Sequence, residues 1–300
     1  MKAITDTLRL LVLASWLGGV AGSANAQAVT VITIADKPLR IIRGAAIYKA
    51  VGGTIVQKDD IVETAAGSAQ LEAGLDAIIA MGPNTRLYVG ALASDAKATE
   101  VQLLQGWIKL VSKGGARPGL ASVGLQSSFA SGAVIVCSKP GKDALFADDG
   151  EQLVTRIDDK GKSGILVKVP PEQFAFVLAG QPLVVQARPT KDFLAEMPPP
   201  FRDRLASAPQ STRAPKVAAI KERDADFADV APWLSAALPA RKGFVARFRP
   251  RLKDSQFRKQ LEESLPGPEW KAALNPPATA VRAPAAPGNP PAARPDNHIF

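Results

Sequence analysis

Short runs of aliphatic and aromatic residues, separated by turn residues, make up most of the chain between residues 27 and 190. Gly, Pro, Asn or Asp stands between successive runs, and none of them shows a convincing helical spacing of apolar residues. The pattern predicts an all-β domain, built as a barrel, a sandwich or a β-helix-like roll. The expected strands are residues 29–34, 39–42, 45–49, 60–64, 68–72, 77–81, 85–89, 101–111, 133–137, 151–157, 164–169, 173–177 and 183–187.

The strand pattern stops at residues 188–190. Thr190 is expected to cap a short helix, because its hydroxyl can accept a hydrogen bond from an N–H of the first turn, and Pro198 ends that helix. Residues 206–216 are rich in Ser, Pro and Ala and are expected to be an exposed linker. Residues 191–222 are therefore predicted to join two units.

A helical spacing of apolar residues, interrupted by prolines, characterises residues 223–274. The first predicted helix begins at Asp224 or Asp226, and the third begins at Asp254, because an Asp side chain caps a helix start well. This region is expected to form a small helical module that packs on itself or on the β domain. The predicted helices are residues 224–238, 240–248, 254–265 and 269–274.

The two ends of the chain differ from the rest. Lys2 and Arg9 precede an apolar run, residues 10–20, and the small residues Ala24-Asn25-Ala26 follow it, which is typical of a cleavable secretory signal. The run is well short of the roughly 20 residues that span a bilayer, so an uncleaved anchor is the less favoured alternative. At the other end, residues 275–300 contain seven Pro and almost no apolar anchor, which predicts disorder.

The predicted organisation is therefore mainly β, with an all-β domain of many short strands, a small α-helical module and a disordered Pro/Ala-rich tail. Cleavage after Ala26 would leave a mature chain that begins at Gln27 outside the cytoplasm. The expected divisions are a signal peptide at 1–26, the β domain at 27–190, a linker at 191–222, the helical module at 223–274 and the tail at 275–300.

Cysteine and histidine content limits the chemistry. Cys137 is the one cysteine of the 300 residues, so no intrachain disulfide can form. Its place in the run 133–137 favours a small buried hydrophobe, with a reactive thiol or an intermolecular link as the alternatives. The one histidine, His298, lies in the predicted tail, where no scaffold would position it for catalysis. We therefore predict no enzyme, no cofactor and no metal site.

Two loops contain residues found at phosphate or calcium sites. Residues 158–164 include Gly-Lys-Ser, but a phosphate-binding loop needs a glycine where Arg156 stands and a helix afterwards, so a hairpin turn is expected. Residues 148–151 offer carboxylates that suit calcium, but they lack the length and the distal Glu of a calcium-binding helix–loop–helix. Bound calcium there is the minor alternative.

The stretch from residue 60 to residue 89 resembles the core of the FecR-like domain family, the periplasmic iron-dicitrate sensor type. In that family a Gly-Asp precedes an aliphatic residue and a Thr, and an aliphatic strand ends near Pro-x-Thr; here Asp59 replaces the usual Gly. A second landmark is Gly106-Trp107, within residues 101–111, where the glycine suggests a bend. Trp107 is expected to pack on the sheet, with a sugar platform as the alternative. The matching residues of the first landmark are Asp60, Val62, Thr64, Leu71, Ile79, Pro83 and Thr85.

The resemblance implies a bacterial periplasmic location. It also implies one possible role, because members of the iron-dicitrate type receive a signal from an outer-membrane transporter and pass it to a cytoplasmic sigma factor. Such transducers carry a cytoplasmic segment before a membrane span, whereas here nine residues precede the apolar run. Our main hypothesis is therefore a non-enzymatic binding or scaffold module of the cell envelope. Direct control of a sigma factor is the alternative hypothesis.

Positive charge is concentrated in the second half of the chain. Residues 27–190 carry 17 Lys and Arg against 15 Asp and Glu, whereas residues 191–300 carry 18 against 12. An exported protein would not meet nucleic acid, so the expected partner of these basic residues is an envelope protein or an anionic envelope polymer. The alternative is that they are simply the solvent-exposed faces of short helices. The candidate residues for such a partner are Arg241, Lys242, Arg247, Arg249, Arg251 and Lys253.

Overall fold

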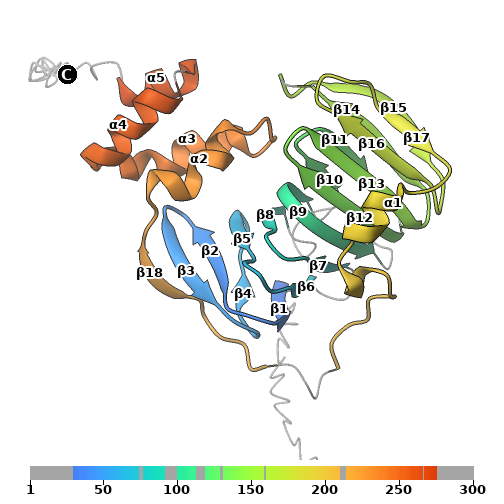
Figure 1. The fold of residues 1–300 in the computed structure, drawn as a ribbon. Helices are drawn as coiled ribbons and strands as arrows, with labels where there is room; N and C mark the ends of the chain where they lie inside the picture. Colours follow the sequence, from blue (N-terminus) through green and yellow to red (C-terminus); the bar gives the residue numbers. More distant parts are fainter. Residues whose placement is uncertain are drawn as a thin grey trace, which may run out of the picture.

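The computed structural model describes residues 30–73, 77–91, 100–112, 119–128, 131–158, 160–209, 214–265 and 267–275. Within these residues the chain is mainly β, and its longer helices lie near the C-terminal end (Figure 1). This confirms the predicted fold class. The expected signal peptide at 1–26, its cleavage site, and residues 276–300 of the expected disordered tail lie outside the described residues.

The strands form two sheets that share one long strand. Pairing between the described strands is antiparallel, except that β9 and β10 run parallel. Sheet A contains, in order, β4 (Ile55–Val56), β1 (Thr30–Ala35), β6 (Ala69–Ala73), β7 (Ala77–Met81), the second half of β9 (Glu100–Ser112), β12 (Gly132–Lys139), β13 (Lys142–Asp149), β16 (Phe174–Leu178) and β17 (Val184–Gln186). Sheet B contains, in order, β18 (Ile220–Asp224), β3 (Ala46–Ala50), β2 (Leu39–Arg43), β5 (Asp60–Glu63), β8 (Arg86–Ala91), the first half of β9, β10 (Gly119–Ser122), β11 (Leu125–Ser128), β14 (Gln152–Ile157) and β15 (Ser163–Val169).

Strand β9 passes from one sheet to the other at Gly106. Before this residue β9 pairs with β8 and β10, and after it β9 pairs with β7 and β12. Gly106 has a φ of 97°, in the region that favours glycine, and this local turn redirects the strand. The bend expected at this glycine is therefore confirmed.

The main core lies between the facing sides of the two sheets. Alternate residues of each strand point into it, as the period of two requires, and each fully buried aliphatic side chain contributes about 1.5–3 kcal/mol relative to exposure. Completely buried members of this core include Ile32, Ile41, Val62, Leu71, Ile79, Leu87, Leu103, Ile108, Leu110, Val134 and Val154.

The outer side of sheet A is covered by the segment from residue 190 to residue 209. It contains α1 (Lys191–Glu196) and η1 (Pro199–Phe201), and Phe193 and Phe201 pack with Trp107 in a second core. The fully buried Lys109 of β9 donates hydrogen bonds to the Phe201 and Asp203 carbonyls, each at 2.9 Å. The residues expected to be a linker, 191–222, thus include elements that contact the sheet.

The outer side of sheet B is covered by the helices near the C-terminal end, shown in orange to red in Figure 1. Their aromatic side chains form a third core with Ile42, Ile47 and Ile61 of the sheet. Of the two packings expected for this module, on itself or on the β domain, both occur. The elements are α2 (Phe227–Ser235), α3 (Arg241–Phe248), η3 (Arg249–Lys253), α4 (Ser255–Ser264) and α5 (Pro268–Leu274).

Local sequence signals agree well with the helix starts. The Thr190 hydroxyl accepts from the Phe193 N–H at 3.2 Å, and the Asp254 carboxylate accepts from the Gln256 and Phe257 N–H groups. Strands β14 and β15 pair as an antiparallel hairpin, and the Gly161 N–H donates to the Asp158 carbonyl in the turn, as expected for the loop that contains Gly-Lys-Ser. The apolar pattern did not predict five strands, which are β4, β10, β11, β13 and β18.

Candidate functional site

Two parallel rows of side chains lie on the outer face of sheet B. The first, the apolar row, consists of Ile47, Ile42, Ile61 and Tyr88, which stand opposite one another on β3, β2, β5 and β8. The helices cover this row, because these four side chains pack against the aromatic core of the module. Residues two positions along each strand point to the same face, so they form the second row.

The second row, which we call the polar ladder, consists of polar and charged residues alone. Lys49 lies opposite Arg40, Arg40 opposite Glu63, Glu63 opposite Arg86, and Arg86 opposite Gln105. Each of these five residues comes from a different strand. At about 4.8 Å between strands, the ladder crosses roughly 19 Å of the sheet.

A pocket of about 440 Å³ lies over the polar ladder, within the size range of ligand sites. The turns that follow β5 and β7 form one rim, through Thr64, Ala65 and Asn84. Glu222, from the bulged part of β18, adds a carboxylate at the end next to Lys49. The lining residues are Pro38, Leu39, Arg40, Lys49, Glu63, Thr64, Ala65, Asn84, Arg86, Gln105 and Glu222.

Glu63 is the fixed centre of the ladder. Its side chain is 6% exposed and forms an ion pair with Arg40, and the Arg86 Nε lies 3.6 Å from its other oxygen. The Trp233 indole N–H of α2 also points at this carboxylate, at 3.3 Å. Since all these donors converge on one acid, Glu63 holds both arginines in place. Lys49 is exposed and forms no ion pair within the described part of the chain.

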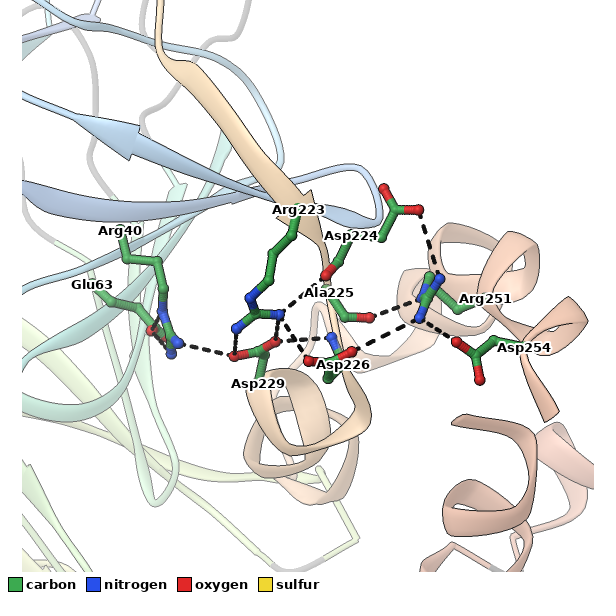
Figure 2. A network of polar contacts seen from close by, with 9 residues as sticks. All are labelled: Arg40, Glu63, Arg223, Asp224, Ala225, Asp226, Asp229, Arg251 and Asp254. Carbon is green, nitrogen blue, oxygen red and sulfur yellow. Dashed lines mark hydrogen bonds and ion pairs between the residues drawn. The ribbon is translucent and has the colours of Figure 1, made fainter. Parts of the chain in front are cut away.

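A network of ion pairs extends from the ladder into the helical module, as Figure 2 shows. Arg40 contacts Asp229 of α2 at 3.0 Å, and Arg223 of β18 contacts the same carboxylate with two nitrogens, at 2.7 and 3.0 Å. Asp229 also accepts the Asp226 backbone N–H, which completes the helix capping box. One acid therefore joins β2, β18 and the start of α2.

Burial raises the pKa of Asp229, but the hydrogen bonds from Arg223 and from the Asp226 N–H, with the charge of Arg40, lower it more. The net result is a pKa below the ordinary value of 3.8. The carboxylate is thus charged at neutral pH and holds both guanidinium groups beside the pocket.

The far end of the network lies within the module. Arg251 donates to the Ala225 carbonyl at 2.8 Å and to Asp254 at 2.8 Å (Figure 2). Its guanidinium lies over the Phe257 ring, 5.5 Å from the centroid. Arg251 is therefore occupied by contacts that connect the end of β18 to α4.

Arg247, another residue of the predicted basic cluster, is also occupied. It donates to three backbone carbonyls of the β domain, those of Ile42, Gly44 and Asp59. Burial lowers the pKa of Arg247. The structure thus separates the cluster into Arg247 and Arg251, which dock the module, and Lys242, Arg249 and Lys253, which are exposed on α3 and η3; Arg241 is partly buried at the start of α3.

Four of the residues that carry the FecR-like resemblance, Thr64, Thr85, Gly106 and Trp107, lie together at the bend of β9. The Thr64 hydroxyl donates to the Gly82 carbonyl at 2.7 Å and accepts the Thr85 N–H at 2.9 Å. The Thr85 hydroxyl in turn accepts the Trp107 N–H at 3.0 Å and donates to the Trp107 carbonyl at 3.1 Å. Trp107 is buried against Phe193, with ring centroids 4.8 Å apart, which agrees with sheet packing.

The other motif residues have structural surroundings as well. Asp60 is 1% exposed and receives two hydrogen bonds from Arg43, at 2.9 and 2.6 Å. Val62 lies in the main core, and Pro83 belongs to the turn between β7 and β8. Asp59, which stands where the family has Gly, adopts a φ of 67°, so the position needs a left-handed backbone whichever residue occupies it.

Two further results concern other kinds of site. In the part of the chain that the structure describes, no group of three His, Cys, Asp or Glu side chains is placed to hold a metal ion. Asp148, in the loop considered for calcium, pairs with the Lys109 ammonium at 2.8 Å. No helix among the described residues is long and apolar enough to cross a bilayer.

The polar ladder was not recognised from the sequence. Arg40 and Glu63 each stand next to a core residue, which is the available signal that they face outward. That signal indicates which side chains of each strand face outward, but it does not indicate the order in which the strands pair. The register that places Lys49, Arg40, Glu63 and Arg86 in one row appears only in the folded sheet.

Comparisons with known proteins give limited similarity. No protein-family model and no curated protein matches the chain. Two crystal structures described as "a putative anti-sigma factor" from Parabacteroides distasonis ATCC 8503 are similar to it, with a TM-score of 0.38 each and sequence identities of 10% and 9%. The similarity covers 45% of this chain and 62% and 63% of those chains, so this chain spans less than two thirds of the length of either.

Proposed function

We propose that this protein is a non-enzymatic binding module of the bacterial cell envelope, and that the pocket over the polar ladder is where it holds a partner protein. The observation that carries the proposal is the contrast between the two rows on one sheet face. The helices bury the apolar row and leave the adjacent row of charged side chains lining a pocket of about 440 Å³.

The rigidity of this row favours recognition. Arg40 and Arg86 are held by Glu63, and Arg40 is held a second time by Asp229. Side chains that are already ordered lose little conformational entropy when a partner binds, so their contacts contribute more to affinity. A pre-positioned row of charged groups also defines which partner fits, because a mismatched charge opposite it is costly.

The charges of the row indicate the chemistry of the partner. Glu63 is already neutralised by the two arginines and is only 6% exposed, so it offers little to a ligand. Lys49 is exposed and has no ion pair among the described residues, and Arg86 is 30% exposed. Lys49 and Arg86 lie three strand spacings apart, roughly 14 Å. A protein segment that carries two carboxylates, one opposite Lys49 and one opposite Arg86, is therefore the partner that we propose.

Site-specific crosslinking in cells tests this proposal. A photo-reactive residue at position 49 is expected to capture a specific partner, whereas the same residue at the exposed position 191, on α1, is not. The matched substitutions are Lys49→Glu and Lys191→Glu, both on exposed side chains. The first is expected to weaken binding of the identified partner by about 10-fold or more, and the second to leave it unchanged. Equal capture from both positions, or equal affinities, contradicts the proposal.

The periplasmic location is part of the proposal and rests on residues 1–26. The chain purified from a bacterial envelope fraction is expected to begin at Gln27, which N-terminal sequencing or intact-mass measurement determines. Recovery of the unprocessed chain from the cytosol would contradict this part of the proposal.

An anionic envelope polymer is the alternative partner, and the structure changes which residues would bind it. Because Arg247 and Arg251 are occupied by docking contacts, the exposed Lys242, Arg249 and Lys253 are the groups available. Salt-dependent retention on lipopolysaccharide that is lost in the triple alanine variant of these three residues would favour this partner. Retention that the triple variant keeps would exclude this surface.

Regulation of an extracytoplasmic-function sigma factor is the second candidate function. The observation that favours it is the corner formed by Thr64, Thr85 and Trp107, because it joins residues from both landmarks of the FecR-like resemblance. Transcript levels in a deletion strain complemented with the Lys49→Glu or the Lys191→Glu chain test it. If the protein regulates a sigma factor through the ladder, the strain with Lys49→Glu is expected to show the transcript levels of the deletion strain. The strain with Lys191→Glu is expected to show those of the wild type. Identical transcript levels in all strains would oppose this role.

A further inference from the structure

Strand β15 is an open edge of sheet B. It pairs with β14 on one side, and no strand of the described residues pairs with its other side. Figure 1 shows β15 beside β14, away from helices α2–α5. An open edge presents a row of backbone N–H and C=O groups that another strand can pair with.

The side chains of this edge are unusually apolar and unusually exposed. Ile165 is 86% exposed, the largest value among the exposed large hydrophobic residues of the described chain, and Leu166 is 59% exposed. These neighbours point to opposite faces of the strand, so neither face is covered there. Exposed edges usually carry charges or proline, but the charge in β15, on Lys168, is paired with Glu151 at 3.2 Å.

We infer that β15 pairs antiparallel with β15 of a second copy of this chain, with the two-fold axis at Leu166. In this register Leu166 lies opposite Leu166 of the partner copy, and Ile165 lies opposite Val167 of the partner copy. Lys168 meets Gly164, which has no side chain, so no like charges oppose each other. All seven residues of the strand find a counterpart.

Neighbouring registers match less well. Moving the axis by one residue, to Ile165, would place Lys162 opposite Lys168, and like charges directly opposite each other destabilise a sheet. Moving the axis the other way, to Val167, would place Lys168 opposite Leu166 instead of opposite a glycine. The register with the axis at Leu166 therefore pairs the exposed aliphatic side chains with one another, and a second copy of this chain supplies the matching strand.

Disulfide trapping tests the pairing and its register together. Leu166→Cys places two thiols directly across the axis, where Cβ atoms are about 4.5–5.5 Å apart in an antiparallel pair. Lys168→Cys is the matched control, since residues 168 of the two copies would be four positions apart along the strands. Mild oxidation of the full-length chain is expected to give a covalent dimer with the first variant alone. Equal yields from both variants, or no dimer from either, would overturn the inference.

Sedimentation of the unmodified chain gives an independent measurement. A single strand pair is a small interface, so a weak, concentration-dependent dimer is expected between about 1 μM and about 1 mM. Leu166→Lys sets two ammonium groups face to face and is expected to weaken dimerisation at least about 10-fold, whereas Leu178→Lys, at a side chain 42% exposed on β16, is not. A wild-type chain that stays monomeric throughout overturns the inference. If such a monomer captures an extended segment of another protein through β15, that segment is the occupant of the edge.

Discussion

A Cβ atom on Gly106 would lie 2.5 Å from the Cα atom of Thr85 and 2.5 Å from its hydroxyl oxygen. The two backbones approach this closely because Thr85 donates to and accepts from Trp107, the residue that follows the glycine. The contact sits where β9 leaves sheet B and enters sheet A. The bend therefore depends on a residue without a side chain next to a residue with a hydroxyl.

Replacement of Gly106 is expected to be costly. Gly106→Ala adds a methyl group against backbone atoms and forces a φ of 97° on a residue with a Cβ, so we expect a loss of more than about 2 kcal/mol in the free energy of unfolding. Urea unfolding followed by tryptophan fluorescence measures this loss. Gly141→Ala is the control, because φ is 76° there but no atom lies within 4 Å, and about 1 kcal/mol is expected. Similar losses for both would show that the close approach costs nothing.

Arg247 is expected to attach the helical module to the β domain. Arg247→Met keeps the length of the side chain but leaves the Ile42, Gly44 and Asp59 carbonyls without their donor. We expect the free energy of unfolding to fall by about 2–3 kcal/mol, measured by urea unfolding, and the module to become sensitive to protease. Arg249→Met, on an exposed arginine, should stay within about 0.5 kcal/mol of wild type. If Arg247→Met leaves the free energy of unfolding unchanged, the aromatic packing alone is enough to attach the module to the β domain.

The ion-pair network should make this attachment sensitive to acid. Because the pKa of Asp229 is lower in the folded chain than its ordinary value of 3.8, its contribution is fully present above that value and is lost as pH falls through the folded pKa. Asp229→Asn is expected to cost about 2 kcal/mol at pH 7 and progressively less below about pH 4. Unfolding measured at both pH values gives the difference. A cost that does not change with pH would show that the charge of Asp229 is not what matters.

Cys137 is expected to be unreactive in the folded chain. Burial raises the pKa of its thiol to about 12, and the side chain is 5% exposed in the core under α1, as the strand pattern predicted. At pH 8 we expect alkylation at least about 100-fold slower than in urea, because the thiolate is the reacting form. Mass spectrometry after timed exposure to iodoacetamide measures both rates. Rapid modification without denaturant would favour the reactive-thiol alternative.

Several features of the fold follow from local sequence, and these were predicted well. Helix starts at Thr190 and Asp254 depend on a side chain that bonds to an N–H two or three residues away, so a few neighbouring residues decide them. Strands with clear apolar alternation and turn residues were predicted for the same reason. Strand β13, Lys142–Asp149, was missed because it carries charges at both ends, including the buried Asp143, whose partner Ser122 lies 21 residues away.

The roles of charged residues required the tertiary structure. Arg247 and Arg249 are two residues apart in one basic run, yet the first contacts backbone carbonyls more than 180 positions earlier and the second is exposed. A count of charges treats them alike. Which arginine docks the module depends on how α3 lies against the β2–β3 turn, and no local pattern specifies that orientation.

The sequence by itself determined that this protein is mainly β with a helical C-terminal part, because alternation, turn residues and caps act over a few positions. It also determined which face of each strand is polar. Only the tertiary structure decided that Lys49, Arg40, Glu63, Arg86 and Gln105 form one row, because strand order and register come from long-range pairing that buries the apolar faces of all the strands together.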